Sequence, residues 1–213
     1  MKIDILTLFP EMFGGPFDHS IVKRAREVGK VEIKIHNLRD WAIDKHNTVD
    51  DRPYGGGAGM VLRVDVVDNA LSDLRKKNTK TILLSPQGKV FKQKKAREFS
   101  RLKHIILVAG HYEGFDQRVR EHLVDEVISI GEYVLTGGEL PAMIITDTIV
   151  RLIPGVLSED ATKNESFSEE NTLDYPQYTR PEKYKGWSVP PTLLSGNHKE
   201  IEEWRKEKQK KVK

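Results

Sequence analysis

The sequence predicts an α/β fold with a mainly parallel sheet, and three observations support that prediction. Short apolar segments alternate with amphipathic ones along most of the chain, which is the order of strand–helix units. Between residues 81 and 141, each apolar strand segment runs into a loop that contains Gly or Pro. The 213 residues include 38% hydrophobic and 31% charged residues, which is the composition of a globular protein with enough apolar material for a core.

The first elements follow from hydrophobic periodicity. Residues 2–8 and 31–35 alternate between apolar and polar side chains and are expected as strands, whereas 18–28 and 65–76 have helical spacing. Residues 39–60 are polar, rich in glycine and without periodicity. Because compact domains rarely carry such long loops without a functional reason, this segment is a candidate for function.

The later elements alternate regularly. The expected order is strand 81–85, helix 93–102, strand 104–109, helix 116–124, strand 126–130 and an apolar helix 139–153, which Pro154 and Gly155 end. Ligands lie at the carboxyl ends of parallel strands, so the three Gly-containing loops after these strands predict one ligand site. Residues 158–172 are polar and predict a flexible linker, and a terminal helix is expected from about His198.

Composition and charge exclude several classes of protein. The chain has no cysteine, which excludes disulfides, thiolate catalysis and Cys-bound zinc. No apolar run reaches the roughly 18 residues of a membrane span, and the N-terminus lacks the features of a secretory signal, so a cytoplasmic location is expected. The net charge is only +3, but residues 197–213 carry seven Lys or Arg against four Glu. This tail is equally consistent with a solvated helix face and with an RNA-contacting one.

Several common enzyme motifs are missing. Gly55-Gly56-Gly57-Ala58-Gly59 has the wrong spacing for a dinucleotide fingerprint, and Gly88-Lys89 lacks the other residues of a Walker A loop. Neither H-E-x-x-H nor G-x-S-x-G occurs, and the seven histidines are scattered. These absences exclude the common nucleotide hydrolases, dehydrogenases, zinc peptidases and serine hydrolases, and they predict no His-based metal site.

Five ordered segments are specific enough to identify a family. They are Asp50 to Met60 (DDRPYGGGAGM), Leu84 to Gly88 (LSPQG), Gly110 to Gly114 (GHYEG), Ser129 to Pro141 (SIGEYVLTGGELP), and Tyr178 to Pro181 (YTRP) followed by Val189 to His198 (VPPTLLSGNH). Together they closely resemble the bacterial tRNA (guanine-37, N-1) methyltransferases. The resemblance runs along nearly the whole chain, from Leu8 to Arg205.

The resemblance implies a SPOUT fold, whose parallel-sheet domain ends in a deep trefoil knot and is joined to a small helical C-terminal domain. On this chain the SPOUT domain is expected over 1–157, with the knot and cofactor site at about 81–141. A flexible linker is expected over 158–173 and the tRNA-binding domain over 174–213. The resemblance also implies a homodimer with shared active sites, S-adenosylmethionine as cofactor and Mg²⁺ for activity, although the sequence shows no cluster of metal ligands.

The family's cofactor positions fall on the three predicted strand-end loops. An adenine ring requires flat apolar walls and backbone hydrogen bonds, which Leu, Ile, Pro and Gly supply, and a carboxylate such as Glu113 would favour the sulfonium cation. The residues implied to bind the cofactor are Leu84, Pro86, Gly110, Tyr112, Glu113, Ile130, Gly131, Tyr133, Val134, Leu135, Gly137, Gly138 and Pro141.

Two residues match the family's catalytic positions. Guanine N-1 carries a proton at neutral pH, so its methylation requires a base and a cation or donor set near O-6. The resemblance implies Glu165 as the base, where several relatives have Asp, and Arg151 at the end of the apolar helix as the cation. Without the resemblance, Glu165 would be read as a solvated charge and Arg151 as a residue favoured by the helix dipole.

The loop at 50–60 and the linker are implied to hold the guanine. A flipped-out base is required because N-1 is buried in paired or stacked RNA. The residues implied on the substrate side are Asp50, Arg52, Tyr54, Gly55, Gly56, Gly57, Gly59 and Ser166, although Asp50 and Arg52 are equally consistent with a scaffold ion pair. His111 stands where relatives more often have Arg, and the sequence assigns it no role.

The sequence leaves open two alternative functions, and it differs from the relatives in one respect. A SPOUT enzyme that methylates ribose 2′-hydroxyls would share the fold, and a non-catalytic RNA-binding module would share the surface. Many relatives extend a few dozen residues beyond the position of Trp204 and Arg205, whereas this chain stops at Lys213. The C-terminal domain is therefore either short by nature or truncated.

Overall fold

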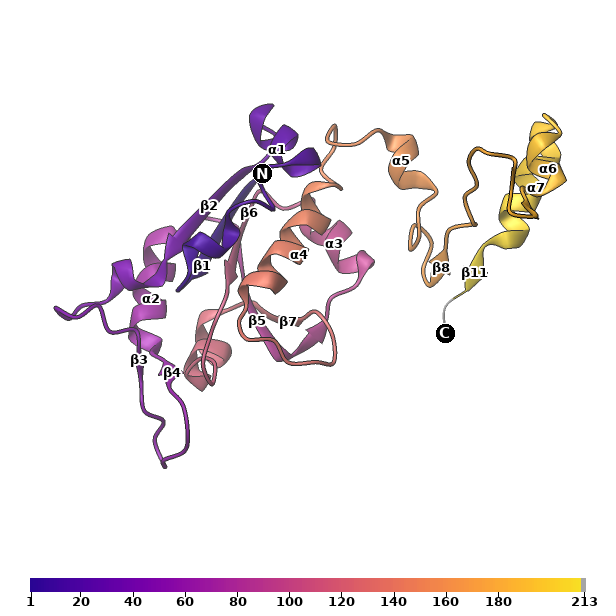
Figure 1. Ribbon diagram of the computed structural model, residues 1–213. Helices are drawn as coiled ribbons and strands as arrows, with labels where there is room; N and C mark the ends of the chain where they lie inside the picture. The colour runs from indigo at the N-terminus through magenta and orange to yellow at the C-terminus, as the bar shows by residue number, and fades with distance from the viewer. Residues whose placement is uncertain (212–213) are drawn as a thin grey trace. The chain divides into compact units, whose positions relative to one another are not determined.

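The computed structural model divides the chain into two compact units, Met1–Leu157 and Ser158–Lys213 (Figure 1). It describes residues 1–211, with the side chains of Glu159 and Asp160 left aside, so the last two residues of the basic tail, including Lys213, lie outside the described residues. Among residues 1–211, no helix combines the length and the apolar character that a membrane crossing requires.

A five-stranded sheet forms the centre of the first unit. Its strands are β1 (Lys2–Thr7), β2 (Glu32–Asn37), β5 (Thr79–Val90), β6 (His104–Val108) and β7 (Glu126–Ser129), in the order β2-β1-β6-β5-β7. Every neighbouring pair is parallel. The predicted α/β class with a parallel sheet is therefore confirmed.

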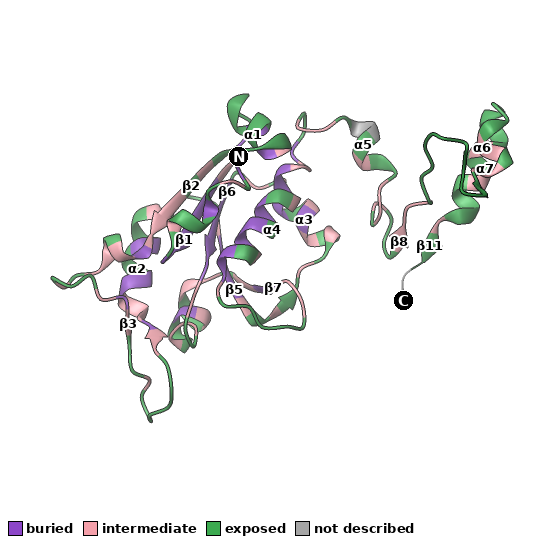
Figure 2. Cartoon of the chain, in the orientation of Figure 1, coloured by how far each residue is buried: buried purple, intermediate pink, exposed green. Residues whose placement is uncertain are grey.

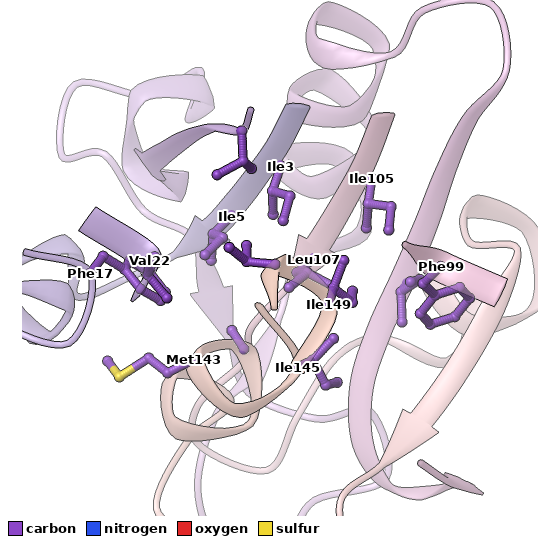
Figure 3. Close-up of a cluster of buried hydrophobic side chains, with 14 of the residues drawn as sticks. Ile3, Ile5, Phe17, Val22, Phe99, Ile105, Leu107, Met143, Ile145 and Ile149 are labelled. Atoms are coloured by element: carbon purple, nitrogen blue, oxygen red, sulfur yellow. The ribbon is translucent and has the colours of Figure 1, made fainter. Parts of the chain in front are cut away.

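Both faces of the sheet are buried, as expected for parallel strands connected by helices. On one face, Ile3, Ile5 and Leu107 pack with residues of α4 (Glu139–Val150) such as Ile145 and Ile149 (Figure 3). The helices α1 (Ser20–Glu27) and α3 (Gln93–Phe99) also contribute to this cluster, whereas α2 (Val64–Leu74) contributes to the cluster on the other face. Each fully buried aliphatic side chain contributes about 1.5–3 kcal/mol, so these two clusters stabilise the unit.

The remaining elements of the first unit are short or locally irregular. They are the 3-10 helices η1 (Pro10–Phe13) and η2 (Leu38–Trp41), the strands β3 (Asp50–Asp51) and β4 (Val61–Leu62), the π-helix η3 (Val119–Leu123) and the helix α4 (Glu139–Val150). The strands β3 and β4 pair antiparallel, so the predicted loop 39–60 is in part the tip of a hairpin. That tip extends away from the sheet (Figure 1).

Three predicted elements differ from the structure. The strand expected to end at Ser85 continues to Val90, because its pairing with β7 resumes after a register shift between Leu84 and Lys89. The helix expected over 116–124 is one π-helical turn, since periodicity does not distinguish the two kinds of helix. The helix expected to reach residue 153 ends at Val150, with Arg151 as its C-cap.

The second unit consists of short elements without a buried core. It contains α5 (Glu159–Lys163), β8 (Thr172–Leu173), β9 (Lys183–Tyr184), β10 (Trp187–Ser188), α6 (Pro191–Leu194), α7 (His198–Lys208) and β11 (Lys210–Lys211). The helix α5 and the strand β8 lie in the segment predicted as a linker. Asn197 caps α7, because its side chain accepts hydrogen bonds from the Lys199 and Glu200 amides. None of the described side chains in this unit is buried (Figure 2).

Candidate functional site

A cavity of about 390 Å³ is lined by the middle of β5, from Leu83 to Gln87, and by the loops that follow β6 and β7. All thirteen residues that the sequence places at the cofactor site line it: Leu84, Pro86, Gly110, Tyr112, Glu113, Ile130, Gly131, Tyr133, Val134, Leu135, Gly137, Gly138 and Pro141. They come from three segments of the chain, one within β5 and two that follow β6 and β7. The parallel sheet brings these segments together because β6 and β7 both lie beside β5.

Glycines let the backbone approach closely around the cavity. A Cβ at Gly138 would lie 2.7 Å from the Ala109 Cα and 2.8 Å from the Gly110 amide nitrogen, so only glycine fits there. The Gly138 amide donates a 2.8 Å hydrogen bond to the Gly110 carbonyl. At the same edge, Tyr112 has a φ of 59°, a left-handed conformation that is rare outside glycine and is held here by the surrounding loop.

The wall of the cavity contains both apolar and polar side chains. Leu84, Ile130, Leu135 and Pro141 supply apolar surface. Polar groups come from further residues that sequence reasoning did not assign, namely Ser85, Gln87, His111, Gln117, Arg120, Ser129 and Thr136. Such a wall suits a ligand with a flat apolar part and a few polar groups.

A buried carboxylate lies behind one wall of the cavity. Glu139, in the first turn of α4, is completely buried; its Oε1 accepts a 2.6 Å hydrogen bond from Thr7 Oγ1, and its Oε2 is 2.7 Å from His111 Nε2. His111 is oriented further by the edge of the Phe9 ring, at a centroid distance of 4.5 Å. Glu139 and His111 both lie within the family motifs, but the sequence assigned a role to neither of them. An acidic residue such as Glu139 in the first turn of a helix is ordinary.

The hairpin β3–β4 meets the cavity loops at its base. A Cβ at Gly59 would lie 2.5 Å from Glu113 Oε1, and the Glu113 amide donates a 3.0 Å hydrogen bond to the Met60 carbonyl. The Leu62 amide donates to the Gly114 carbonyl over 2.9 Å. The hairpin is therefore joined to the loop Gly110–Gly114 by backbone contacts.

The other residues implied on the substrate side lie away from the cavity wall. Asp50 pairs with Leu62 in the hairpin, Tyr54 is fully exposed, and Arg52 precedes it in the extended tip. Gly55, Gly56, Gly57 and Gly59 all have positive φ, which explains the glycine run. Ser166, in the second unit, accepts a 3.0 Å hydrogen bond from the Asp174 amide.

The two residues implied in catalysis lie in different units. Arg151 is the C-cap of α4, and its amide donates a 3.2 Å hydrogen bond to the Asp147 carbonyl. Glu165 is half-buried in the second unit, where its carbonyl accepts from the Ser168 amide over 3.0 Å. Within the part of the chain that the structure describes, no group of three or more acidic or His side chains is arranged to hold a metal ion.

Comparison with known proteins gives the cavity a context. The family model described as tRNA (Guanine-1)-methyltransferase TrmD matches residues 1–213. Similar curated proteins are the tRNA (guanine-N(1)-)-methyltransferases of Staphylococcus aureus (strain Newman), 58% identical over 209 residues, and of Staphylococcus epidermidis (strain RP62A), 56% identical over 208. Each comparison covers 97% of this chain and 85% of the relative.

A protein from a third organism has the same name. The tRNA (guanine-N(1)-)-methyltransferase of Carboxydothermus hydrogenoformans is 54% identical over 206 residues, which are 97% of this chain and 81% of the relative. The family match covers the full length, and the identities are high over nearly all of it. The chain therefore belongs to the tRNA (guanine-1)-methyltransferase TrmD family.

Proposed function

We propose that this protein transfers a methyl group from S-adenosylmethionine to N-1 of guanosine 37, next to the anticodon of tRNA. The observation that carries the proposal is the single cavity lined by all thirteen residues expected at the cofactor site, in a chain of this family. The names of the relatives support guanine N-1 of tRNA as the target. The proposed substrate is tRNA in the cytoplasm.

The cavity residues fit S-adenosylmethionine. Adenine requires flat apolar walls with backbone groups between them, and Leu84, Ile130 and Leu135 alternate with glycines here. A Cβ at Gly131 would overlap the Tyr133 ring, so glycine at this position lets that ring pack against the backbone in the cavity wall. When bound, the cofactor supplies an electrophilic methyl group on a sulfonium. The protein's task is to bind it, exclude water and bring the guanine to it.

Glu165 is the proposed base and Arg151 the proposed cation. N-1 is a nucleophile only after it loses its proton, and negative charge then spreads toward O-6. A carboxylate that takes the proton contributes about 10²–10⁴-fold to the rate. A guanidinium near O-6 stabilises the charge that develops there.

The hairpin tip and Ser166 are proposed to hold the extruded guanine. Tyr54 is fully exposed and has a flat ring on which a base can stack, and the neighbouring glycines leave room for it. Asp50 and Arg52 would contact the RNA around the flipped base. The contacts of Gly59 and Met60 with Glu113 tie this hairpin to the cofactor loop, which supports one continuous site.

We also propose that residues 81–141 form the deep trefoil knot of the SPOUT fold. A knot requires backbone segments to pass one another at short range, and close backbone approaches at two glycines support the proposal. A Cβ at Gly88 would lie 2.5 Å from the Ile128 amide nitrogen, and a Cβ at Gly138 would lie 2.7 Å from the Ala109 Cα and 2.8 Å from the Gly110 amide nitrogen. The second unit is proposed as a small tRNA-binding domain, with a homodimer as the active form and Mg²⁺ supporting activity.

The test is transfer of labelled methyl from S-adenosylmethionine to a tRNA transcript with guanosine at positions 36 and 37. We expect transfer to this transcript and none to a matched transcript with adenosine at position 37. Equal transfer to both would favour ribose 2′-hydroxyl methylation, because a ribose is present in each. Binding of the cofactor with no transfer to either RNA would favour a non-catalytic RNA-binding role.

Glu165→Gln tests the base. The amide keeps the size and polarity of the side chain but cannot take a proton, so we expect turnover to fall by about 10²–10⁴-fold. Affinity for S-adenosylmethionine, measured by calorimetry, should stay unchanged because the cavity lies in Met1–Leu157. Near-normal turnover in this variant would remove Glu165 from the proposal.

A further inference from the structure

Gly137 lies beside the hydrogen-bonded pair formed by Glu139 and His111. Gly137 and His111 line the cavity, whereas Glu139 is completely buried behind them. A Cβ at Gly137 would overlap both His111 Nε2 and Glu139 Oε2, so this side of the cavity has only a glycine backbone over a carboxylate. The Glu139 carboxylate therefore lies directly beside a glycine that lines the cavity.

The Glu139 carboxylate faces two hydrogen-bond donors, His111 Nε2 and the Thr7 hydroxyl. A carboxylate only accepts hydrogen bonds, so the Nε2 that lies 2.7 Å from Glu139 Oε2 carries the proton. The other oxygen accepts from the uncharged Thr7 hydroxyl. Among the residues that the structure describes, no lysine or arginine forms an ion pair with Glu139. A buried carboxylate without a fixed cation is costly unless a cation arrives from elsewhere.

The other charged side chains at the cavity, Glu113 and Arg120, cannot take the place of the buried Glu139 carboxylate. Glu113 is exposed and its carboxylate contacts the Gly59 backbone position. Arg120 donates to the Gln87 side chain and carbonyl, so its charge is held at the rim. Exposed charges are screened by water and salt, whereas a charge in the low-dielectric interior acts over several ångströms.

We propose that Glu139, held by Thr7 and His111, makes the cavity selective for a sulfonium cation over a neutral thioether. This inference rests on the proposed function. In the transfer, the bond between sulfur and the methyl carbon breaks, its electron pair stays on sulfur, and N-1 of the deprotonated guanine bonds to the methyl carbon. The cofactor thereby loses its positive charge. A fixed negative charge then favours the methyl donor, S-adenosylmethionine, over the spent product, S-adenosylhomocysteine.

The experiment compares the affinities of the full-length protein for these two ligands by calorimetry. Glu139→Gln keeps the hydrogen-bonding shape and removes the charge, so the affinity for S-adenosylmethionine relative to S-adenosylhomocysteine should fall about tenfold. Glu126→Gln is the matched control, because Glu126 is a partly buried carboxylate paired with Lys80 and Lys95 and does not line the cavity.

A second pair of variants keeps the proposal testable if Glu139→Gln does not fold. His111→Lys leaves Glu139 in place and adds a permanent positive charge beside it, so the affinity ratio should fall by about the same factor. His111→Gln retains a neutral donor and should leave the ratio unchanged.

Each outcome either supports the inference or overturns it. Selective weakening of S-adenosylmethionine in Glu139→Gln and His111→Lys supports it. Equal weakening of both ligands overturns it, because the charge would then act on a group that the two ligands share. An unchanged ratio also overturns it. If the unaltered protein binds neither ligand, the proposed function fails instead, so the two failures are distinguishable.

Discussion

The two units of the chain differ in how they bury side chains. Among the residues whose side chains the structure describes, every buried one lies in Met1–Leu157, where apolar clusters fill both faces of the sheet. From residue 158 to 211, none of the described side chains is buried, and large aromatic side chains such as Tyr178, Tyr184 and Trp187 are at least half exposed. The first unit has its own core and a complete cavity, whereas the second has neither. The difference indicates that most of the stability comes from the first unit, and it agrees with the proposal that the second unit binds tRNA.

Removing the second unit gives the largest expected effect. A chain ended after Leu157 keeps the sheet, both clusters and every residue of the cavity, so it should fold and bind S-adenosylmethionine. It lacks Glu165, so methyl transfer to the guanosine-37 transcript should fall by at least about 10²–10⁴-fold. Calorimetry and the transfer assay check the two parts. Full transfer activity in the shortened chain would contradict the proposal that the second unit supplies the base.

A pair of aromatic substitutions sharpens the same comparison. Phe99 is completely buried and its ring stacks on Phe91 at 6.3 Å, so Phe99→Ala should lower the free energy of unfolding by about 3–5 kcal/mol. Trp187 is 71% exposed, and its main ring contact is Tyr184 at 6.0 Å. Trp187→Ala should change the free energy of unfolding by less than about 0.5 kcal/mol. Urea unfolding measures both; similar losses would show that the second unit has a core of its own.

The parts of the structure that the sequence predicts are those that depend on local pattern. Alternating strands such as Lys2–Thr7 and glycine loops such as Gly110–Gly114 have periods and residue types that report their structure directly. Parallel strands then bring their loops to one edge, so the cavity wall was predicted from three separate segments. The roles of Glu165 and Arg151 came from the family resemblance and remain proposals.

The parts that were missed depend on contacts between distant residues. Thr7 and Glu139 are 132 positions apart, and Asp4 and His104 are 100 apart, so no local pattern relates them. An isolated Asp in an alternating strand is expected to face solvent, yet Asp4 lies in a parallel strand that is buried on both faces. Only the register of β1 with its neighbours brings the partners of Asp4 to it.

Asp4 makes the stability of the first unit depend on pH. Its buried carboxylate contacts His36 Nε2 at 2.7 Å, His104 Nε2 at 2.6 Å and Lys2 Nζ at 2.5 Å. Burial opposes ionisation, but the hydrogen bonds from the two histidines and Lys2 together outweigh it and hold the pKa of Asp4 well below its usual range. Asp4→Asn should therefore destabilise the protein by about 2–4 kcal/mol at neutral pH, because a buried, charge-assisted set of bonds is lost.

The sign of the pH dependence follows from the lowered pKa. A carboxyl that is more acidic in the folded state contributes its full stability above its unfolded pKa and loses it as the pH falls toward the folded value. The gap in free energy of unfolding between the unaltered protein and Asp4→Asn should thus be constant above about pH 5 and narrow below about pH 4. Urea unfolding across this range measures the gap. For Glu126→Gln the gap should be at most about 1 kcal/mol, because Glu126 is partly exposed beside Lys80 and Lys95. A gap for Asp4→Asn that widened in acid would mean that the neutral carboxyl is the favoured form, and Asp4 would then not be an ion-pair centre of the sheet.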